Sequence, residues 1–213
     1  MRTTDRIISG LYAVTPDEPD TQHLATMVGE AIAGGAHLVQ YRNKTASAQL
    51  RAEQAMALLD VCRAGGVALI INDDIDLAAR IGADGLHLGR DDGDLAQARA
   101  RLPSALLGAS CYGDIGRAQV AKRLGADYVA FGSFFASSTK PGATRAPLAI
   151  VAEAKRTVGL PVVAIGGITL ANAPTLLAAG VDAVAVISAL FAAGSVRDAA
   201  QSFTALFTRI GRE

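Results

Sequence analysis

Short apolar runs recur along the chain, and each ends in a small cluster of charged, hydroxyl-bearing or glycine residues. HLVQYRNK, VALIINDD and GLHLGRDD end in charged residues, whereas LLGAS and AVAVIS end in serine. Short and nearly continuous apolar runs are typical of strands that are buried on both faces. They predict eight strands, at residues 10–15, 37–43, 68–72, 85–88, 106–110, 128–133, 161–165 and 183–187.

Longer segments with helical patterning separate these runs. They predict helices at about residues 20–35, 46–64, 75–82, 93–102, 115–125, 148–158, 170–179 and 196–210. Glycine marks several helix ends, because Gly-Ala-Asp occurs at 82–84 and 125–127, with close variants at 35–37 and 180–182. A glycine in this position is typical of a helix C-terminus that is followed by a short connection to the next strand.

Strands that alternate with helices indicate a parallel sheet. Eight such units predict an α/β fold, a single (β/α)8 TIM barrel that takes up residues 1–213 as one domain. A doubly wound open sheet is the alternative, but it rarely needs eight regular units, and no GxGxxG follows the first strand. In a closed barrel the C-terminal ends of the strands converge, so the polar ends of the runs would meet at one rim.

Composition narrows the class of protein. With 213 residues, of which 51% are hydrophobic, the chain is long enough for one well-packed core. Twenty basic and twenty acidic residues leave no net charge, so we expect neither nucleic acid nor a membrane as a partner. The N-terminal segment lacks the features of a signal peptide, and no apolar stretch reaches the ~18 residues of a membrane span. Cys62 and Cys111 lack metal-type spacing and are interpreted as buried free thiols, which favours a cytoplasmic protein.

Two aspartates follow neighbouring predicted strands: Asp73 follows the third and Asp92 the fourth. In a barrel, both would reach the same rim. Two carboxylates without a histidine cluster suit a hard divalent cation, above all Mg²⁺, which takes further oxygens from substrate phosphates. Two alternatives stay open at this point. Asp73 or Asp74 could cap the following helix, and Asp91 could take the place of Asp92.

At the end of the second predicted strand, every second residue carries a long polar or charged side chain. Gln40, Arg42 and Lys44 share one face of an extended strand end, and Tyr41 and Asn43 lie between them. The planar fork of an arginine and the point charge of a lysine together suit a diphosphate. A solvated strand end is the alternative interpretation.

Two further stretches indicate anion binding. The ASSTKPGA loop after the sixth predicted strand carries Lys140 and is either a flexible connection or a lid with anion contacts. Gly166 and Gly167 follow the seventh strand, and Ile187 and Ser188 follow or end the eighth. The loops after these two strands frequently bind a phosphate through backbone N–H groups. The alternative to phosphate binding is structural, because two glycines in a tight turn and a serine that caps a helix would give the same sequence pattern.

The histidines show no catalytic arrangement. His23 and His37 are expected away from the rim, and His87 lies inside a predicted strand, where an interior or core role is favoured. The absence of a Ser–His–Asp pattern gives nucleophilic hydrolysis no support. Two anion sites, one of them with a metal, and no obvious general base favour a transferase that activates a diphosphate leaving group.

Taken together, these segments resemble the thiamine phosphate synthase family. The resemblance rests on QYRNK, IINDD, ADGLHLGRDD, GAS, ADYVAFGSFFASSTKPGA, VVAIGGIT and AGVDAVAVISAL, in that order between about residues 10 and 192. It implies an enzyme that joins 4-amino-2-methyl-5-hydroxymethylpyrimidine diphosphate to a thiazole phosphate, giving thiamine phosphate and pyrophosphate. It also implies that the diphosphate leaves first and that the thiazole nitrogen traps a pyrimidine carbocation.

The resemblance also assigns residues to sites. Asp73 and Asp92 would bind Mg²⁺. Catalytic roles would fall to Arg42, Lys44, Ser110 and Lys140. The pyrimidine diphosphate would contact Gln40, Tyr41, Arg42, Asn43, Lys44, Asn72, Ser110 and Lys140. The thiazole phosphate would contact Ser137, Thr139, Gly166, Gly167, Ile187 and Ser188.

Three positions depart from the pattern of the family. Asp74 stands where arginine is usual and adds negative charge beside the metal site. Ser137 replaces threonine and keeps the hydroxyl, and Arg90 replaces a common glutamine and would offset Asp74. Two other functions are weighed. A thiazole tautomerase-like paralogue on the same barrel would lack the aspartate pair, and a phosphosugar isomerase or epimerase would need an acid–base pair of carboxylates or cysteine. The sequence is compatible with a homo-oligomer.

Overall fold

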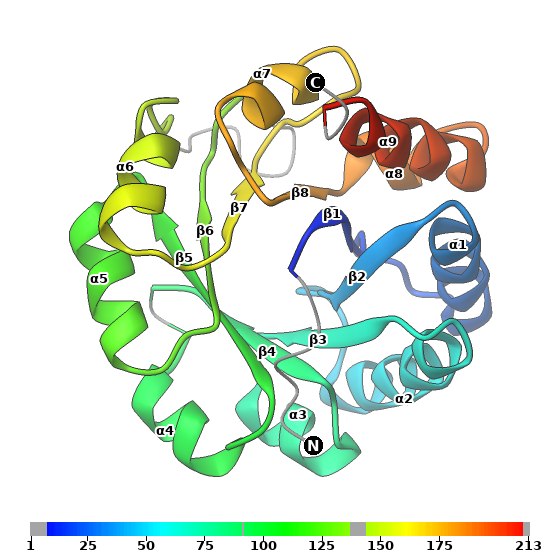
Figure 1. Ribbon diagram of the computed structural model, residues 1–213. Coiled ribbons are helices and arrows are strands. Elements are labelled where there is room, and N and C mark those ends of the chain that lie inside the picture. Colours follow the sequence, from blue (N-terminus) through cyan, green and yellow to red (C-terminus); the bar gives the residue numbers. More distant parts are fainter. Residues whose placement is uncertain (1–7, 91, 137–143, 211–213) are drawn as a thin grey trace.

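The strands close into a barrel in the order in which they occur in the chain. The computed structural model describes residues 8–90, 92–136 and 144–210. All neighbouring strands pair in parallel, and β1 pairs with β8 to complete the ring. Figure 1 shows the strands as an inner ring and the helices as an outer layer. The strands are β1 (Gly10–Val14), β2 (Ala36–Tyr41), β3 (Ala68–Asn72), β4 (Gly85–Leu88), β5 (Leu106–Tyr112), β6 (Tyr128–Phe131), β7 (Val162–Ile165) and β8 (Ala183–Val186). The (β/α)8 barrel is confirmed, and the open sheet is wrong.

A helix follows every strand. The helices are α1 (Thr21–Ala33), α2 (Ala48–Ala64), α3 (Ile75–Ile81), α4 (Leu95–Arg101), α5 (Ile115–Arg123), α6 (Ile150–Thr157), α7 (Ala173–Ala178), α8 (Ser188–Phe191) and α9 (Val196–Ile210). The short α8 directly after β8 is not predicted by the sequence pattern. Two helices, α1 and α4, begin one or two residues later than predicted because an aspartate caps them. Asp94, for example, accepts hydrogen bonds from the backbone of Ala96 and Gln97 and sets the start of α4.

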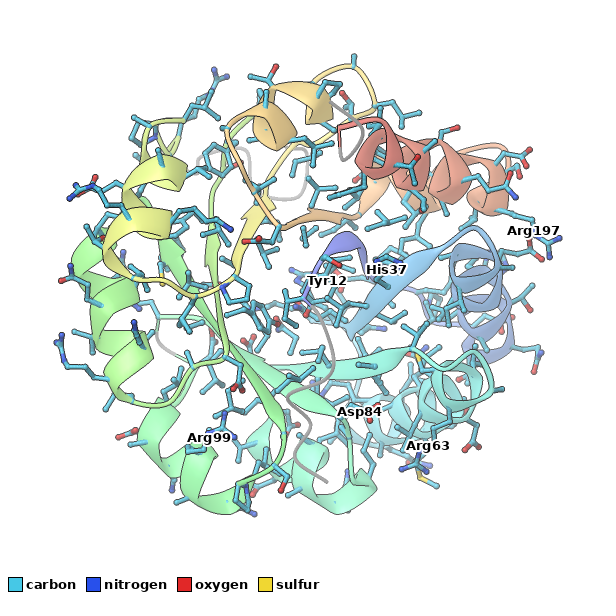
Figure 2. All side chains as sticks on the ribbon, in the orientation of Figure 1. Tyr12, His37, Arg63, Asp84, Arg99 and Arg197 are labelled. Carbon is cyan, nitrogen blue, oxygen red and sulfur yellow. The ribbon has the colours of Figure 1, made fainter. Side chains whose placement is uncertain are left out.

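Alternate residues of each strand face opposite sides of the barrel wall. In β1, Leu11 and Ala13 pack outward against the helices, whereas Tyr12 and Val14 belong to the cluster inside the barrel. Figure 2 shows Tyr12 near the centre of the ring. The period of two residues therefore decides which side chains at a strand end reach the mouth of the barrel.

Aspartates tie the N-terminal ends of the strands together. Asp84, Asp127 and Asp182 each accept a hydrogen bond from a backbone N–H of β3, β5 and β7, at 3.0, 2.7 and 2.7 Å. Each belongs to one of the glycine motifs that precede a strand. Arg99, on α4, adds an ion pair of 2.6 Å to Asp127. The repeated motif thus stabilises the face of the barrel opposite the polar rim, which is the stability face of this fold.

The two cysteines behave as the sequence predicts. Cys62 and Cys111 are free and buried, and both pack in the layer between the sheet and the helices. Burial disfavours the thiolate and raises the pKa of each thiol to about 12. Among the described helices, none is both long and apolar enough to cross a membrane.

Candidate active site

A cavity of about 860 Å³ lies at the C-terminal ends of the strands. It is lined on the side of β2 to β5 by residues assigned to the pyrimidine diphosphate, and on the side of β7 and β8 by residues assigned to the thiazole phosphate. These residues are Gln40, Arg42, Asn72, Ser110, Gly166, Gly167, Ile187 and Ser188. The fold therefore brings two groups of residues that are distant in sequence into one cavity.

The end of β2 divides its residues between the two faces of the wall. Gln40 and Arg42 line the cavity, and Gln40 is buried there. The guanidinium of Arg42 lies 3.3 Å from the carboxylate of Asp17, and its backbone N–H donates to the hydroxyl of Thr15 at 2.8 Å. These contacts with the loop after β1 hold Arg42 at the mouth of the barrel.

Tyr41 and Asn43 face the other way. The hydroxyl of Tyr41 donates to Gln54 of α2 at 2.8 Å, and the amide of Asn43 donates to the carbonyl of Glu18 at 2.9 Å. Both residues are buried. Their side chains therefore join the loop to α2 rather than the cavity. Neither residue lines this cavity, but both border a second, smaller cavity beside Lys44.

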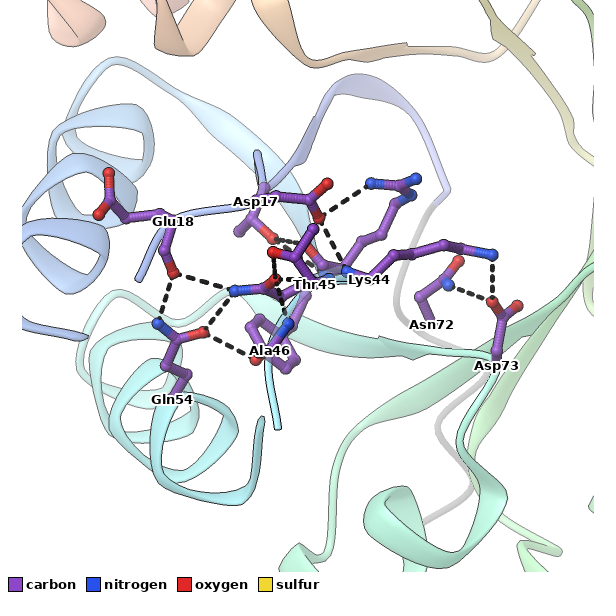
Figure 3. A network of polar contacts seen from close by, with 12 residues as sticks. Asp17, Glu18, Lys44, Thr45, Ala46, Gln54, Asn72 and Asp73 are labelled. Carbon is purple, nitrogen blue, oxygen red and sulfur yellow. Dashed lines mark hydrogen bonds and ion pairs between the residues drawn. The ribbon is translucent and has the colours of Figure 1, made fainter. Parts of the chain in front are cut away.

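Lys44 and Asp73 meet just outside the main cavity. The ammonium of Lys44 lies 3.2 Å from Asp73, and the amide of Asn72 also donates to the carboxylate of Asp73 (Figure 3). A second cavity of about 600 Å³ is lined by all three residues, and Asn72 is common to both cavities. Asp73 adopts a left-handed backbone conformation with φ of 65°, and its N–H donates to the carbonyl of His87 at 2.8 Å. Aspartate tolerates this conformation better than most residues do.

Asp74 is the helix cap, and this decides one of the open alternatives. Its carboxylate accepts from the backbone N–H of Leu77 at 2.8 Å and so begins α3. The negative charge of Asp74 is therefore engaged by the helix terminus, which also reduces its effect on the neighbouring Asp73.

Asp92 lies after β4 and is exposed. A Cβ at Gly89 would lie 2.1 Å from the carboxylate of Asp92, so a larger residue there would require the Asp92 side chain to move. Asp91 lies outside the described residues, and the choice between the two neighbours stays open. No group of three or more His, Cys, Asp and Glu side chains is placed to hold a metal within residues 8–90, 92–136 and 144–210.

The turn after β7 has room for glycine only. Gly166 and Gly167 have φ of 101° and 63°. A Cβ at Gly166 would lie 2.0 Å from the hydroxyl of Ser133, and one at Gly167 would lie 2.1 Å from the carbonyl of Ala136. Both glycines line the cavity, and glycine permits the close approach of an anion to backbone N–H groups.

The loop after β6 falls partly outside the described residues. Ser137, Thr139 and Lys140, which the resemblance assigns to the two substrates, are among the residues that the structure does not describe. Their roles stay predictions.

Several residues that line the cavity were not assigned from the sequence. They are Tyr12, His87, Arg90, Tyr112, Ser133, Thr144, Arg145 and Thr169. Alternation along the strands could have found the first two, because Tyr12 and His87 occupy inward positions near the ends of β1 and β4. His87 is an interior histidine, as interpreted, but its Nε2 also lies 2.9 Å from the hydroxyl of Ser110.

An arginine and a tyrosine form part of the rim after β4 and β5. The guanidinium carbon of Arg90 lies 4.7 Å from the ring centre of Tyr112, a cation–π distance. Tyr112 follows an irregularity in the pairing of β5 with β6 and has φ of 57°. Such a conformation costs ~1–3 kcal/mol and is typical of functional sites. Arg90 thereby brings a positive charge to the cavity, on the side where the diphosphate is expected.

The fold and the rim define a (β/α)8 barrel with cationic and polar groups gathered where barrel enzymes keep their active sites. Comparison with known proteins supplies the family. The sequence model described as thiamine monophosphate synthase matches residues 11–190. The chain belongs to this family.

Individual relatives agree with this assignment. The thiamine-phosphate synthase of Methylobacillus flagellatus is 56% identical over 201 residues, which cover 94% of this chain and 96% of that protein. The thiamine-phosphate synthase of Thiobacillus denitrificans is 53% identical over 199 residues, 93% of this chain and 94% of that protein. The solved structure of a thiamine phosphate pyrophosphorylase from Pyrococcus furiosus matches with a TM-score of 0.86 and 33% identity, over 96% and 98% of the two chains. A 3-hexulose-6-phosphate synthase, with a TM-score of 0.69, 21% identity and coverage of 92% and 98%, shares the fold alone.

These comparisons confirm the resemblance to the family and the expectation of a transferase. The thiazole tautomerase and the phosphosugar isomerase or epimerase are not favoured.

Proposed function

We propose that the chain catalyses the condensation of 4-amino-2-methyl-5-hydroxymethylpyrimidine diphosphate with a thiazole phosphate in the 860 Å³ cavity. The bond between the pyrimidine methylene carbon and the diphosphate oxygen breaks, and pyrophosphate leaves with the electron pair. The ring nitrogen of the thiazole then donates its lone pair to the methylene carbon and forms the new C–N bond of thiamine phosphate.

One observation carries this proposal. The cavity has cationic and polar groups at the ends of β2 to β5 and a glycine turn after β7, so it offers two different environments to two phosphorylated molecules. Arg42 lies in the first and Gly166 and Gly167 in the second. Both substrates carry phosphate on one side and a ring on the other, which allows the rings to meet between the two anion sites.

Positive charge near β2 favours the departure of pyrophosphate. Arg42 and Lys44 are held by Asp17 and Asp73, which position both cations before a substrate arrives. Preorganised cations stabilise charge that develops on a leaving group more than they stabilise the bound substrate. Lys140 joins this group in the proposal, although it lies outside the described residues.

The residues present also fit Mg²⁺. Asp73 offers a carboxylate at the end of β3 that is 23% exposed, and Asp92 offers a second, exposed carboxylate after β4. Mg²⁺ typically binds one or two protein carboxylates and takes its other ligands from phosphate oxygens and water, so the pair is chemically sufficient with a diphosphate bound. The cation would supply additional neutralisation of the diphosphate. With the cation on Asp73, the ammonium of Lys44 would move partly from Asp73 to the diphosphate.

Two observations speak against other chemistry on this barrel. Asp73 and Asp92 are both present, which a tautomerase-like paralogue would not need. Cys111 is buried in the outer layer with its pKa raised to about 12, so its thiol is unsuited to an acid–base role at the rim.

We further propose a cytoplasmic location, since two free thiols suit a reducing compartment. Phosphorylated small molecules are the partners that fit the cavity. A homo-oligomer stays a prediction, as does the single domain.

The direct test is an end-point assay with purified full-length protein, both phosphorylated precursors and Mg²⁺. We expect thiamine phosphate and pyrophosphate in equal amounts, and neither product when one precursor is left out. Chelation with EDTA should stop turnover, and added Mg²⁺ should restore it. Absence of thiamine phosphate under conditions in which a known member of the family produces it would refute the proposed function.

A further inference from the structure

An unbroken line of hydrogen bonds crosses the inside of the barrel from β2 to β5. The amide nitrogen of Gln40 donates to the hydroxyl of Tyr12 at 2.9 Å, and the hydroxyls of Tyr12 and Tyr128 lie 2.8 Å apart. The Tyr128 hydroxyl lies 3.1 Å from Nδ1 of His87, whose Nε2 lies 2.9 Å from the hydroxyl of Ser110. Both ends of this line, Gln40 and Ser110, line the cavity.

The protons of this line can be counted. Burial raises the pKa of both Tyr12 and Tyr128 far above the usual range, so each hydroxyl keeps one proton to donate. Because Tyr12 already accepts from Gln40, its own proton goes to Tyr128. The proton of Tyr128 then goes to Nδ1 of His87, which leaves the ring proton on Nε2, where it is donated to Ser110.

If the hydrogen bonds were donated in the opposite direction, from His87 toward Tyr12, the buried hydroxyl of Tyr12 would be left without an acceptor. With the proton on Nδ1, His87 would donate to Tyr128, and Tyr128 to Tyr12. Tyr12 would then accept from both Gln40 and Tyr128, and its own proton would have no acceptor among the residues that the structure describes. Since Tyr12 is only 1% exposed, this arrangement is disfavoured. A doubly protonated His87 ring would also donate from Nδ1 to Tyr128 and would leave the same Tyr12 proton without an acceptor.

The packing around the histidine preserves this line. The rings of His87 and Tyr128 stack with centroids 5.6 Å apart and an interplanar angle of 29°. A Cβ at Gly108 of β5 would lie 2.1 Å from the ring of Tyr128 and 2.5 Å from Nδ1 of His87. Any residue larger than glycine at position 108 would therefore push Tyr128 and His87 apart.

We propose that His87 is a positioning residue, held by Tyr128 as the neutral Nε2–H tautomer, which makes the Ser110 hydroxyl donate its own proton toward the cavity. At the other end of the line, one amide N–H of Gln40 donates to Tyr12, which leaves the carbonyl oxygen of Gln40 to accept a hydrogen bond from a ligand in the cavity. The line then offers a ligand one hydrogen-bond acceptor from β2 and one donor from β5. An aminopyrimidine edge, with its amino donor and ring-nitrogen acceptor, is complementary to this pair. The choice of ligand rests on the proposed function, whereas the tautomer does not.

The tautomer can be measured without substrate by ¹⁵N–¹H correlation of the histidine rings at neutral pH. The chain has three histidines, and the signals lost in His87→Gln identify His87. We expect a protonated Nε2 and a bare, hydrogen-bonded Nδ1 in the full-length protein. In Tyr128→Phe the Nδ1 signal should shift, because its donor is gone. A protonated Nδ1 in the wild type would overturn the proposal.

Kinetics test the consequence for the ligand. Tyr128→Phe should lower kcat/KM for the pyrimidine diphosphate roughly tenfold, with the KM for the thiazole phosphate unchanged. His87→Gln, which retains an N–H donor toward Ser110, should keep more activity than His87→Leu. Equal losses in these two variants, or unchanged constants in folded Tyr128→Phe, would overturn the positioning role.

Thr204→Val is the matched control. It also deletes one hydroxyl by an isosteric change, but this hydroxyl donates to the carbonyls of Gly34 and Gly35, between α1 and β2. It should leave the His87 signals and both KM values unchanged. If the wild type made no thiamine phosphate while His87 was the Nε2–H tautomer, the proposed function would fail and the tautomer assignment would stand.

Discussion

Asp73 and Asp74 are neighbours in the chain, but their carboxylates face different partners. The left-handed backbone of Asp73 turns its side chain toward Lys44 and Asn72, whereas Asp74 returns to an extended conformation and caps α3. The same division separates Arg42 from Asn43 at the end of β2. At the residue scale, backbone geometry therefore decides which of two adjacent polar residues can bind a ligand.

Asp73→Asn tests the metal role at this scale. Loss of the charge should raise the Mg²⁺ concentration for half-maximal turnover on the order of tenfold or more, because ligand charge dominates the binding of a hard cation. The measurement is initial rate against free Mg²⁺. Asp76→Asn is the control, since Asp76 is 83% exposed and pairs with Arg101. Identical Mg²⁺ dependence in Asp73→Asn and the wild type would remove Asp73 from the metal site.

The turn after β7 is the element that forms the second anion site of the proposed function. Its two glycines have positive φ, and their missing side chains allow Ser133 and Ala136 to lie against them. The substitution of either glycine should therefore move the backbone that faces the thiazole phosphate and leave the end of β2 in place.

Gly167→Ala should raise the KM for the thiazole phosphate about tenfold, because its Cβ would meet the carbonyl of Ala136 at 2.1 Å. The KM for the pyrimidine diphosphate should stay within a factor of about two. Gly194→Ala serves as control, since a Cβ there meets nothing within 4 Å. If Gly167→Ala raised only the KM for the diphosphate, the two-site arrangement would be incorrect.

At the N-terminal ends of the strands, the aspartates that directly precede β4, β6 and β8 contribute to stability. They are Asp84, Asp127 and Asp182. Asp182→Ala removes the acceptor of the buried N–H of Val162 and the partner of Lys155. The free energy of unfolding should fall by about 1–3 kcal/mol. Urea denaturation measures this change, and kcat should be unaltered in folded protein. The exposed pair of Asp76 and Arg101 provides the comparison, because Asp76→Ala should cost less than about 1 kcal/mol. Equal effects of the two changes would contradict the role of the motif.

At the scale of the whole molecule, two buried thiols make stability depend on pH. Burial raises the pKa of Cys62 and Cys111 to about 12. Above the usual thiol pKa of ~8.5, the unfolded chain releases both protons while the folded chain retains them. The unfolded state then binds fewer protons, so the free energy of unfolding falls as pH rises, by up to about 1.4 kcal/mol per pH unit and thiol.

Cys62→Ala isolates one of these thiols. Unfolding in urea at pH 8, 9 and 10 should show a shallower loss of stability in the variant than in the wild type. The difference in stability between the two proteins should shrink by about 1–2 kcal/mol from pH 8 to pH 10. Parallel pH profiles would show that Cys62 keeps an ordinary pKa in the folded protein.

Sequence patterning alone determined the architecture and much of the rim. Periodicity and helix-end glycines predict the eight strands and helices, because buried parallel strands are nearly continuously apolar and must connect through helices. The ends of those strands also supply Gln40, Arg42, Asn72, Ser110 and the glycine pair, since the C-terminal ends converge in any closed barrel. The short α8 carried no such signal, because four residues are too few for a helical period to be seen.

Only the tertiary structure decided which side chains meet. Tyr12, Tyr128 and His87 lie on three different strands, and their hydrogen bonds arise only when β1, β4 and β6 face one another across the barrel. The inward direction of Gln40 and the outward direction of Tyr41 likewise depend on the register of β2 with β1 and β3. A sequence records which residues are adjacent along the chain, whereas the chemistry of this site depends on distances across the barrel.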